Sequence, residues 1–411
     1  MSSTLHQRGP SPEEEANELH HLPVERGLAW LLLGFFLLLI TVRPLLSLRS
    51  EEVRRVFTTF AEQLTLAKDK DGAREKNRQL RRAIQEFDDD LEKNSRFSDR
   101  LQPIWHQALA SLGSGHETVH VGKNGWLEYR PAFEYVTGAP ILDPFRLRAW
   151  PDADPRPAIQ KFAADLALRG IVLWVMPAPS KVMVHPESFA PELRDAAEEL
   201  DNPSFAALRQ ELRAAGIRVF EPLPVLRQLA REKQVYFKTD SHWNPLGIDA
   251  TAAALAAALE AEVPLGPRSK EWRRQTQQLD YAGDLARMLH LENSPDYPPE
   301  LVEVQVVTDA KGRLWKNDPQ AEVLLLGDSF ANIFSPRGAG LAAQLAFYLG
   351  RDVDRVVMDG GGPVGTREQL DRELRQKPHR RLATTKVVVL EFAARELAIG
   401  RWRVLQLRRP T

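Results

Sequence analysis

The chain has 411 residues, 43% of them apolar, and its 17 Phe and 9 Trp can build two domains or one large domain with appendages. A net charge of -1 gives no reason to expect a nucleic-acid partner. The sequence has no cysteine, which excludes disulfides and thiolate metal sites.

The N-terminal region divides into a polar tail and an apolar segment. Residues 1–26 are polar and acidic and are predicted to be disordered. Gly27 to Val42 reads GLAWLLLGFFLLLITV, without a charge, and approaches the roughly 20 apolar residues that one membrane span needs. We therefore expect residues 27–47 to form a transmembrane helix. A buried core helix and a cleaved signal peptide are the alternatives, and the long acidic tail argues against the signal peptide.

The next region is rich in charge. Residues 50–100 carry many Glu, Arg, Lys, Asp and Gln, with apolar residues at helical intervals. This pattern is typical of amphipathic helices, and we expect residues 48–115 to form a helical stalk or linker.

From residue 116 to 411, apolar runs alternate with helical patterns. Asn244 as cap with Pro245 at the first helical position predicts a helix over 245–260. Thr366 followed by Gln369 predicts a capping box for a helix that begins at Arg367. Apolar strands alternating with helices predict an α/β domain whose parallel sheet is covered on both faces. The expected strands are 171–176, 217–220, 323–326, 356–358 and 387–390.

The stretch GHETVH contains the spacing H-E-x-x-H that zinc proteases present from a helix. Here glycines lie on both sides, and Thr118, Val119 and Val121 are β-branched, which predicts a short strand. On a strand, His116 and His120 would lie about 13 Å apart, too far to bind one zinc ion. We interpret them as ordinary strand histidines and expect no metal site.

Two other segments carry residues suited to acyl-transfer chemistry. Ser329 follows the apolar strand that ends at Gly327-Asp328, and in α/β sheets ligands bind at the carboxyl ends of strands. A serine there is a candidate nucleophile if a base lies nearby; otherwise it is a turn serine that caps the next segment.

Asp240 and His242 are two residues apart, just before the helix capped by Asn244. In an extended strand end, side chains at this spacing point the same way, so Asp240 would orient the His242 ring. The alternative is a helix-entry loop in which His242 is merely packed.

Five motifs occur here in an order that resembles the AlgX/AlgJ family of polysaccharide O-acetyltransferases, whose catalytic domain is SGNH-hydrolase-like. The similarity covers roughly residues 95–403. The Asp-x-His pair precedes the serine in that family, as it does in this chain, and Glu128 departs from the Phe usual there. The motifs are VGKNGWL at 121–127, VMPAPSK at 175–181 with Pro186-Glu187, TDSHW at 239–243, LGDSF at 326–330 and EFAAREL at 391–397.

This resemblance implies a Ser-His-Asp triad of Ser329, His242 and Asp240, with an acyl group carried on the serine. The N–H of Ser329 is one expected oxyanion donor. Gly361 in the loop 360–362 is another, or part of a plain turn, and Asn332 is a side-chain candidate. Arg395 either orients substrate or neutralises a carboxylate of the core. Lys181 is expected to be structural.

The resemblance further implies a polysaccharide acceptor, a membrane-bound O-acyltransferase partner that supplies acetyl groups, and no metal or diffusible cofactor. It implies a single-pass protein of the bacterial inner membrane with a periplasmic catalytic domain. The arginines conflict with that orientation, because one precedes the apolar segment and four follow it, namely Arg26 and then Arg43, Arg49, Arg54 and Arg55. An acetyl esterase with the same triad and a non-catalytic polysaccharide-binding scaffold remain alternative functions.

Overall fold

The computed structural model describes residues 117–193, 200–376 and 381–407, with scattered helical positions before them. The chain separates into two compact units, residues 1–102 and 103–411. None of residues 1–26 is described, and of the predicted span 27–47 only Gly34 is. Among the described residues, no helix combines the length and the apolar character that crossing a membrane requires. The described positions between 48 and 115 are all helical.

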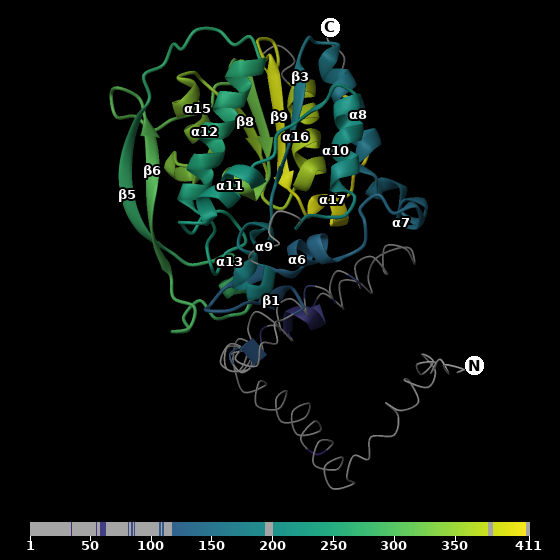
Figure 1. Ribbon diagram of the computed structural model, residues 1–411, viewed down its shortest axis with the longest axis vertical. Coiled ribbons are helices and arrows are strands. Elements are labelled where there is room, and N and C mark those ends of the chain that lie inside the picture. The colour runs from purple at the N-terminus through teal and green to yellow at the C-terminus, as the bar shows by residue number, and fades with distance from the viewer. Residues whose placement is uncertain are drawn as a thin grey trace, which may run out of the picture. The chain divides into compact units, whose positions relative to one another are not determined.

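The second unit is an α/β domain built around a five-stranded sheet (Figure 1). The strands are β3 (Val172–Ala178), β4 (Arg218–Val219), β7 (Val323–Gly327), β8 (Asp354–Val357) and β9 (Val387–Ala393). Their order across the sheet is β4-β3-β9-β7-β8, and every neighbouring pair is parallel. The predicted parallel sheet is therefore confirmed, with strand ends displaced by at most three residues.

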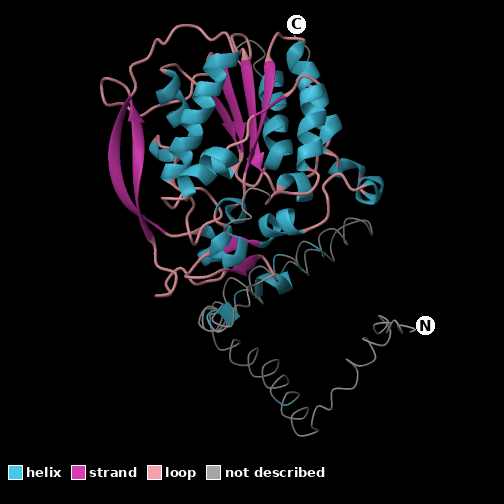
Figure 2. Cartoon of the chain, viewed as in Figure 1, coloured by secondary structure: helices cyan, strands magenta, loops and turns pink. Residues whose placement is uncertain are grey.

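Helices cover both faces of this sheet (Figure 2). Alternate residues of each central strand enter two different apolar clusters; in β7, for example, Val323 and Leu325 face one cluster and Leu324 and Leu326 the other. The first cluster is completed by α11 (Leu223–Ala230), α12 (Pro245–Glu262) and α15 (Leu341–Leu349). The second is completed by α8 (Pro155–Ala167), α10 (Phe205–Ala214) and α16 (Gly362–Gln376).

Two antiparallel pairs of strands lie outside the sheet. β1 (Val119–Val121) pairs with β2 (Leu127–Tyr129), which confirms the strand predicted within GHETVH; His116 lies outside the described residues. β5 (Arg273–Tyr281) pairs with β6 (Glu300–Thr308), and Val304 and Val306 of β6 join the first apolar cluster. This second pair was not predicted, because the β5 sequence RRQTQQLDY is almost entirely polar.

The helix starts show one correct prediction and one error. Asn244 caps α12 as predicted, its side chain accepting from Leu246 N and Gly247 N. The helix predicted to begin at Arg367 instead begins at Gly362, so Thr366 lies buried inside α16 and is not its cap. Pro363 in the first turn accounts for the earlier start, because its fixed φ suits that position.

The remaining helices are short. They are α6 (Arg130–Thr137), α7 (Pro144–Ala149), α9 (Lys181–Val184), α13 (Asp284–Met288), α14 (Ser329–Asn332) and α17 (Glu396–Ile399). The end of the sheet at which the parallel strands finish faces α6, α9 and α13 (Figure 1).

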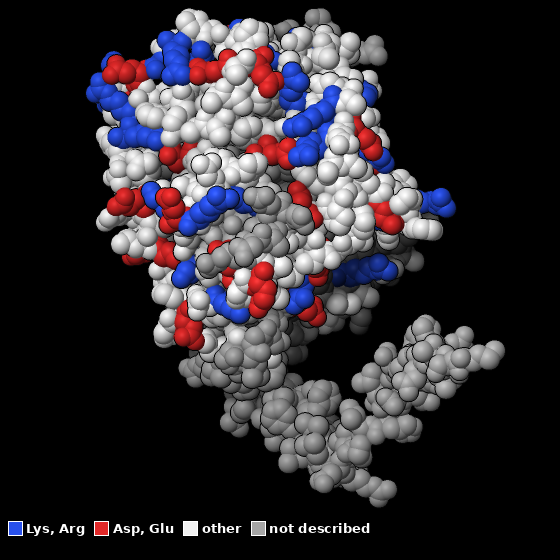
Figure 3. All heavy atoms as spheres, in the orientation of Figure 1, with Lys and Arg blue, Asp and Glu red and all other residues white. Residues whose placement is uncertain are grey.

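The surface carries charges of both signs. On the face shown in Figure 3, positive and negative side chains are interspersed over the described residues.

Candidate active site

Ser329 lies in a turn at the carboxyl end of β7, which we call the nucleophile turn (Gly327–Ser329). Asp328 caps α14, its Oδ1 accepting from Phe330 N at 2.9 Å. Its Oδ2 accepts from Ala393 N, the last residue of β9, at 2.8 Å. One buried carboxylate thus fixes the turn and joins the ends of two neighbouring strands.

Glu391 lies beneath this turn within β9, fully buried, and accepts from Asp328 N at 3.0 Å. Burial, and then the charge of Asp328, raises the pKa of Glu391 well above its usual range. A side chain on Gly327 would collide with this arrangement, since a Cβ would lie 2.4 Å from Ala331 Cβ and 2.7 Å from Glu391 Oε2. The turn therefore requires glycine at this position.

Asp240 and His242 lie in residues 235–244, which we call the base loop. An antiparallel bridge between Tyr236 and Trp243 closes the loop, and residues between them form a bend. The extended strand end predicted for this pair is therefore wrong. The bend nevertheless joins the two side chains, because Asp240 Oδ1 accepts from the His242 backbone N at 2.9 Å and faces His242 Nδ1 at 2.6 Å.

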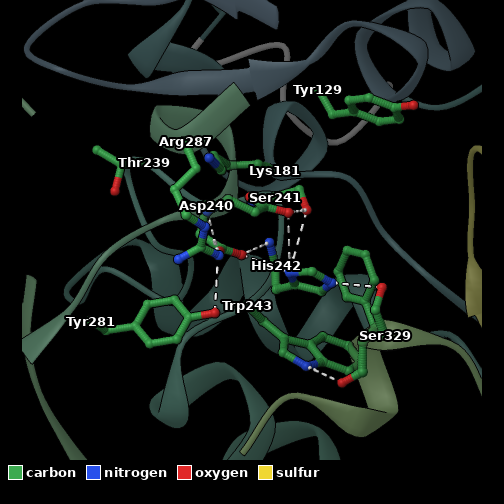
Figure 4. Close-up of polar contacts among 12 residues, drawn as sticks. Tyr129, Lys181, Thr239, Asp240, Ser241, His242, Trp243, Tyr281, Arg287 and Ser329 are labelled. Atoms are coloured by element: carbon green, nitrogen blue, oxygen red, sulfur yellow. Dashed lines mark hydrogen bonds and ion pairs between the residues drawn. The ribbon is translucent and has the colours of Figure 1, made fainter. Parts of the chain in front are cut away.

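The base loop and the nucleophile turn meet at the imidazole ring. His242 Nε2 lies 2.8 Å from Ser329 Oγ, on the opposite side of the ring from Asp240 (Figure 4). With Nδ1 protonated toward Asp240, Nε2 is left to accept the hydroxyl proton. Phe330 packs against the ring at 4.7 Å between centroids. Asp240 and His242 are buried, whereas Ser329 is only half-buried and thus open to an incoming molecule.

The charges of the pair stabilise each other. Burial on its own would raise the pKa of Asp240, but the charge and hydrogen bonds of His242 outweigh it and lower that pKa. Burial opposes protonation of His242, yet the charge of Asp240 outweighs it and raises the pKa of the imidazole. His242 is therefore a stronger base than a solvent-exposed histidine.

Sequence reasoning missed two residues that contact the base loop. Tyr281 OH donates to Asp240 Oδ2 at 3.1 Å, and Asp284 N donates to the same oxygen at 2.9 Å. The Asp284 carboxylate accepts from Ser241 N at 2.7 Å and Ser241 Oγ at 2.6 Å. The available signal in the sequence was Gly283-Asp284 at the start of a helix. The residues that Asp284 contacts, however, lie over 40 residues away in the sequence.

The other predicted residues lie as follows. Gly361 N donates to Met358 O at 3.1 Å and is therefore already engaged. Asn332 Nδ2 donates to Asp359 at 2.9 Å, which uses one of its two amide N–H groups. The Arg395 guanidinium lies over two aromatic rings, 5.0 Å from that of Tyr129 and 5.6 Å from that of Phe330. Its charge also opposes the rise that burial causes in the pKa of Glu128, Glu391 and Glu396.

Lys181 is fully buried and donates to Leu127 O and, at 3.1 Å, to Lys238 O. It therefore connects β2 to the base loop, with the buried Glu128 as a nearby charge partner. Burial lowers the pKa of Lys181, and the charge of Glu128 opposes this. These contacts agree with the structural part expected for Lys181.

Asp240, His242 and Asp284 hold oxygen and nitrogen atoms within 4.8 Å of one another, close enough to bind a metal ion. Hydrogen bonds within the site already engage each of these side chains. We therefore interpret the group as a hydrogen-bond network.

A groove of about 590 Å³ lies on another side of the base loop, bordered by Lys238, Thr239 and Glu300. Glu300 accepts from Lys238 N at 2.8 Å and so ties the base loop to the start of β6. Neither Ser329 nor His242 lines this groove.

The parallel sheet, flanked by helices, with a serine at the carboxyl end of an inner strand, defines the chain as an SGNH-hydrolase-like α/β protein. A family model described as "SGNH hydrolase-like domain, acetyltransferase AlgX" matches residues 119–394. The chain belongs to this family, as its motifs predicted.

Individual proteins similar to this chain agree with the family assignment. "Probable alginate O-acetylase AlgJ" of Pseudomonas aeruginosa is 26% identical over 307 residues, covering 70% of this chain and 72% of the relative. The solved O-acetyltransferase domain of Pseudomonas putida AlgJ shares the fold with a TM-score of 0.53 and 21% identity, covering 68% of this chain and 91% of that one. The solved Pseudomonas aeruginosa AlgX gives 0.50 and 21%, covering 67% and 61%.

Proposed function

We propose that this protein is an O-acetyltransferase that moves an acetyl group, through an acyl-Ser329 intermediate, onto hydroxyl groups of an exported polysaccharide. The observation that carries the proposal is the continuous chain of contacts from Ser329 Oγ to His242 at 2.8 Å and from His242 to Asp240 at 2.6 Å. The names of the relatives, alginate O-acetylases, support a polysaccharide acceptor.

The reaction proceeds in two halves. His242 Nε2 takes the proton of Ser329 as its Oγ attacks the acetyl carbonyl, and the imidazolium returns that proton to the leaving group. In the second half His242 takes the proton of a sugar hydroxyl, whose oxygen attacks the acyl-serine. The bond from the acetyl carbon to Ser329 Oγ breaks, and the imidazolium returns the proton to that oxygen. Asp240 holds the imidazole tautomer throughout.

The negative oxygen formed in each half needs hydrogen-bond donors. We assign one to the N–H of Ser329, since the first backbone N–H groups of a helix have no partner within the helix. Gly361 N would join only after releasing Met358 O, whereas Asn332 has a second amide N–H beside the one that it donates to Asp359. Arg395, held over Tyr129 and Phe330 beside the serine, is assigned to orient substrate.

A chromogenic acetyl ester tests the chemistry. We expect turnover that falls by about 10³-fold or more in Ser329→Ala and stays unchanged in Ser294→Ala, a serine in the connection between β5 and β6. Unaltered turnover in Ser329→Ala would exclude the acyl-serine. Absence of turnover in the unmodified protein would favour the non-catalytic scaffold. With oligosaccharide added, acetylated sugar identifies a transferase, and acetate alone identifies an esterase that uses water.

The cellular setting belongs to the same proposal. We propose that residues 27–47 anchor the chain in the bacterial inner membrane, with the catalytic domain in the periplasm and a membrane-bound O-acyltransferase passing acetyl groups to it. A reporter fused to the C-terminus tests this; a cytoplasmic reporter, as the arginine count favours, would exclude the exported acceptor. Mass spectrometry of polysaccharide from cells lacking the protein identifies the polymer.

A further inference from the structure

The segment Tyr281–Asp284 packs directly on the base loop, and we call it the clamp segment. It ends β5 and begins α13, outside the parallel sheet. At Gly283 a Cβ would lie 2.0 Å from Thr239 O, so only glycine permits this approach. Leu285 N and Ala286 N of α13 both donate to that carbonyl, at 3.1 and 3.2 Å. The backbone of the clamp segment is thus fixed against the loop that carries the base.

The side chain of Asp284 reaches the Nδ1 side of the imidazole. Its Oδ2 lies 3.8 Å from His242 Nδ1 and accepts a hydrogen bond from the hydroxyl of Ser241, the residue between Asp240 and His242. Ser241 Oγ in turn lies 3.3 Å from His242 Nδ1. Two carboxylates therefore face the same ring nitrogen. Asp240 faces it directly (Figure 4), and Asp284 faces it at longer range with Ser241 beside it.

We propose that Asp284 is a positioning residue of the active site, which acts with Asp240 on His242 by holding Ser241 and by adding a second negative charge near Nδ1. This inference rests on the proposed function. When His242 takes the proton of Ser329, the imidazolium becomes positive, and both carboxylates stabilise it.

The two acids differ in how firmly they hold their charge. Burial, and then the charge of Asp240, raises the pKa of Asp284, whereas the pKa of Asp240 is lowered. Asp240 thus remains ionised to low pH, while Asp284 gains its charge at higher pH than an exposed aspartate. Tyr281 and Lys181 of α9 act electrostatically on the two acids, and Arg395 after β9 acts on His242. Arg287 of α13 acts on Tyr281.

The test is the pH profile of kcat/KM for the acetyl ester, measured on the full chain. Asp284→Asn keeps the size of the side chain and an acceptor oxygen for Ser241 but removes the charge. The Asp284 charge raises the pKa of His242, so its removal lowers that pKa. We expect the acidic limb of the profile to move to lower pH by about 0.5 unit or more, and the plateau to fall about 3- to 10-fold.

Controls separate this effect from a loss of fold. Asp284→Glu restores the charge and should move the limb back toward that of the unmodified protein, and Asp296→Asn, in the same connection between β5 and β6, should leave it in place. In Asp240→Asn the residual rate should fall further when Asp284→Asn is added. An unmoved limb and plateau in Asp284→Asn overturn the proposal while Ser329→Ala stays inactive; a fully active Ser329→Ala overturns the proposed function itself.

Discussion

Ser329 is held by the sheet, whereas His242 is held by side chains and backbone that come from outside it. In the nucleophile turn, the contacts run from Asp328 to β9 and from Glu391 back to Asp328, all within two adjacent parallel strands. The base loop instead depends on the clamp segment, on Glu300 of β6 and on Lys181 of α9.

This difference predicts that substitutions at the two places have different effects. Changes around the nucleophile turn disturb buried strand ends and should lower stability together with activity. Changes around the base loop act on hydrogen bonds to a ring and its acid, and should alter rate and pH dependence with less effect on folding.

The largest effect should come from Asp240→Asn. An amide at this position can stabilise the wrong imidazole tautomer, and without the carboxylate the pKa of His242 falls. We expect ester turnover to drop by about 10³-fold and its acidic limb to move to lower pH. Stopped-flow or steady-state rates across pH measure both. Asp280→Asn, on the exposed face of β5, is the matched control, and equal losses in the two would contradict the assignment of Asp240.

Gly327→Ala tests how the nucleophile turn is held. The added Cβ meets Ala331 Cβ and Glu391 Oε2 at distances that no packed structure tolerates, so we expect a loss of about 1–3 kcal/mol in the free energy of unfolding. Activity should fall with it because Ser329 is displaced. Chemical denaturation followed by fluorescence measures the stability.

A second change sharpens that result. Adding Ala331→Gly removes the closer of the two contacts, and part of the lost stability should return even though glycine itself disfavours the short helix α14. A double variant no more stable than Gly327→Ala alone would show that the contact with Ala331 is not the cause.

Glu391→Gln should show a smaller and pH-dependent effect. Because its pKa is raised by burial, the protonated side chain stabilises the fold at low pH, and this contribution is lost as the pH rises through the folded-state value. Glu391→Gln stays neutral, so its free energy of unfolding should match that of the unmodified protein at low pH and exceed it at high pH. Glu391→Leu leaves Asp328 N without its acceptor and should cost about 1–3 kcal/mol at every pH.

The smallest effect should be that of Tyr281→Phe. Asp240 Oδ2 loses the tyrosine hydroxyl but keeps the donor Asp284 N, so we expect a rate loss of less than about fivefold and under about 1 kcal/mol of stability. Calorimetry and ester turnover measure the two. A loss as large as that of Asp240→Asn would mean that Tyr281 takes part in the chemistry.

The same contrast explains what the sequence could predict. The five strands of the sheet are short apolar runs, and Gly-Asp-Ser at the end of one of them made Ser329 a candidate nucleophile. The resemblance to the family, and not the local pattern alone, then selected Ser329. The clamp segment YAGD carries no periodicity, and β5 is too polar to read as a strand. Its contacts with the base loop span over 40 residues of sequence, so neither Tyr281 nor Asp284 could be assigned from motif or spacing.

The buried charges show a second reason. The sequence gives the residue types of Lys181 and Glu128 but does not show that both are buried. Their burial comes from packing between β2, α9 and the base loop. The wrong helix start predicted at Thr366 has a similar cause. The sequence does contain a capping pattern there, but α16 begins earlier, at Gly362, so Thr366 lies within the helix.

The position of β9 has a consequence for how the chain folds. This strand comes last of the five in sequence but lies in the middle of the sheet, between β3 and β7. Until Val387–Ala393 has been synthesised, β3 and β7 each lack a neighbour, and Asp328 lacks the Ala393 N–H that it accepts from. The sheet closes through contacts of high sequence separation, which slow folding. A chain interrupted before residue 387 would therefore hold two incomplete half-sheets with unpaired apolar edges, and assembly of the serine site would be the final step of its folding.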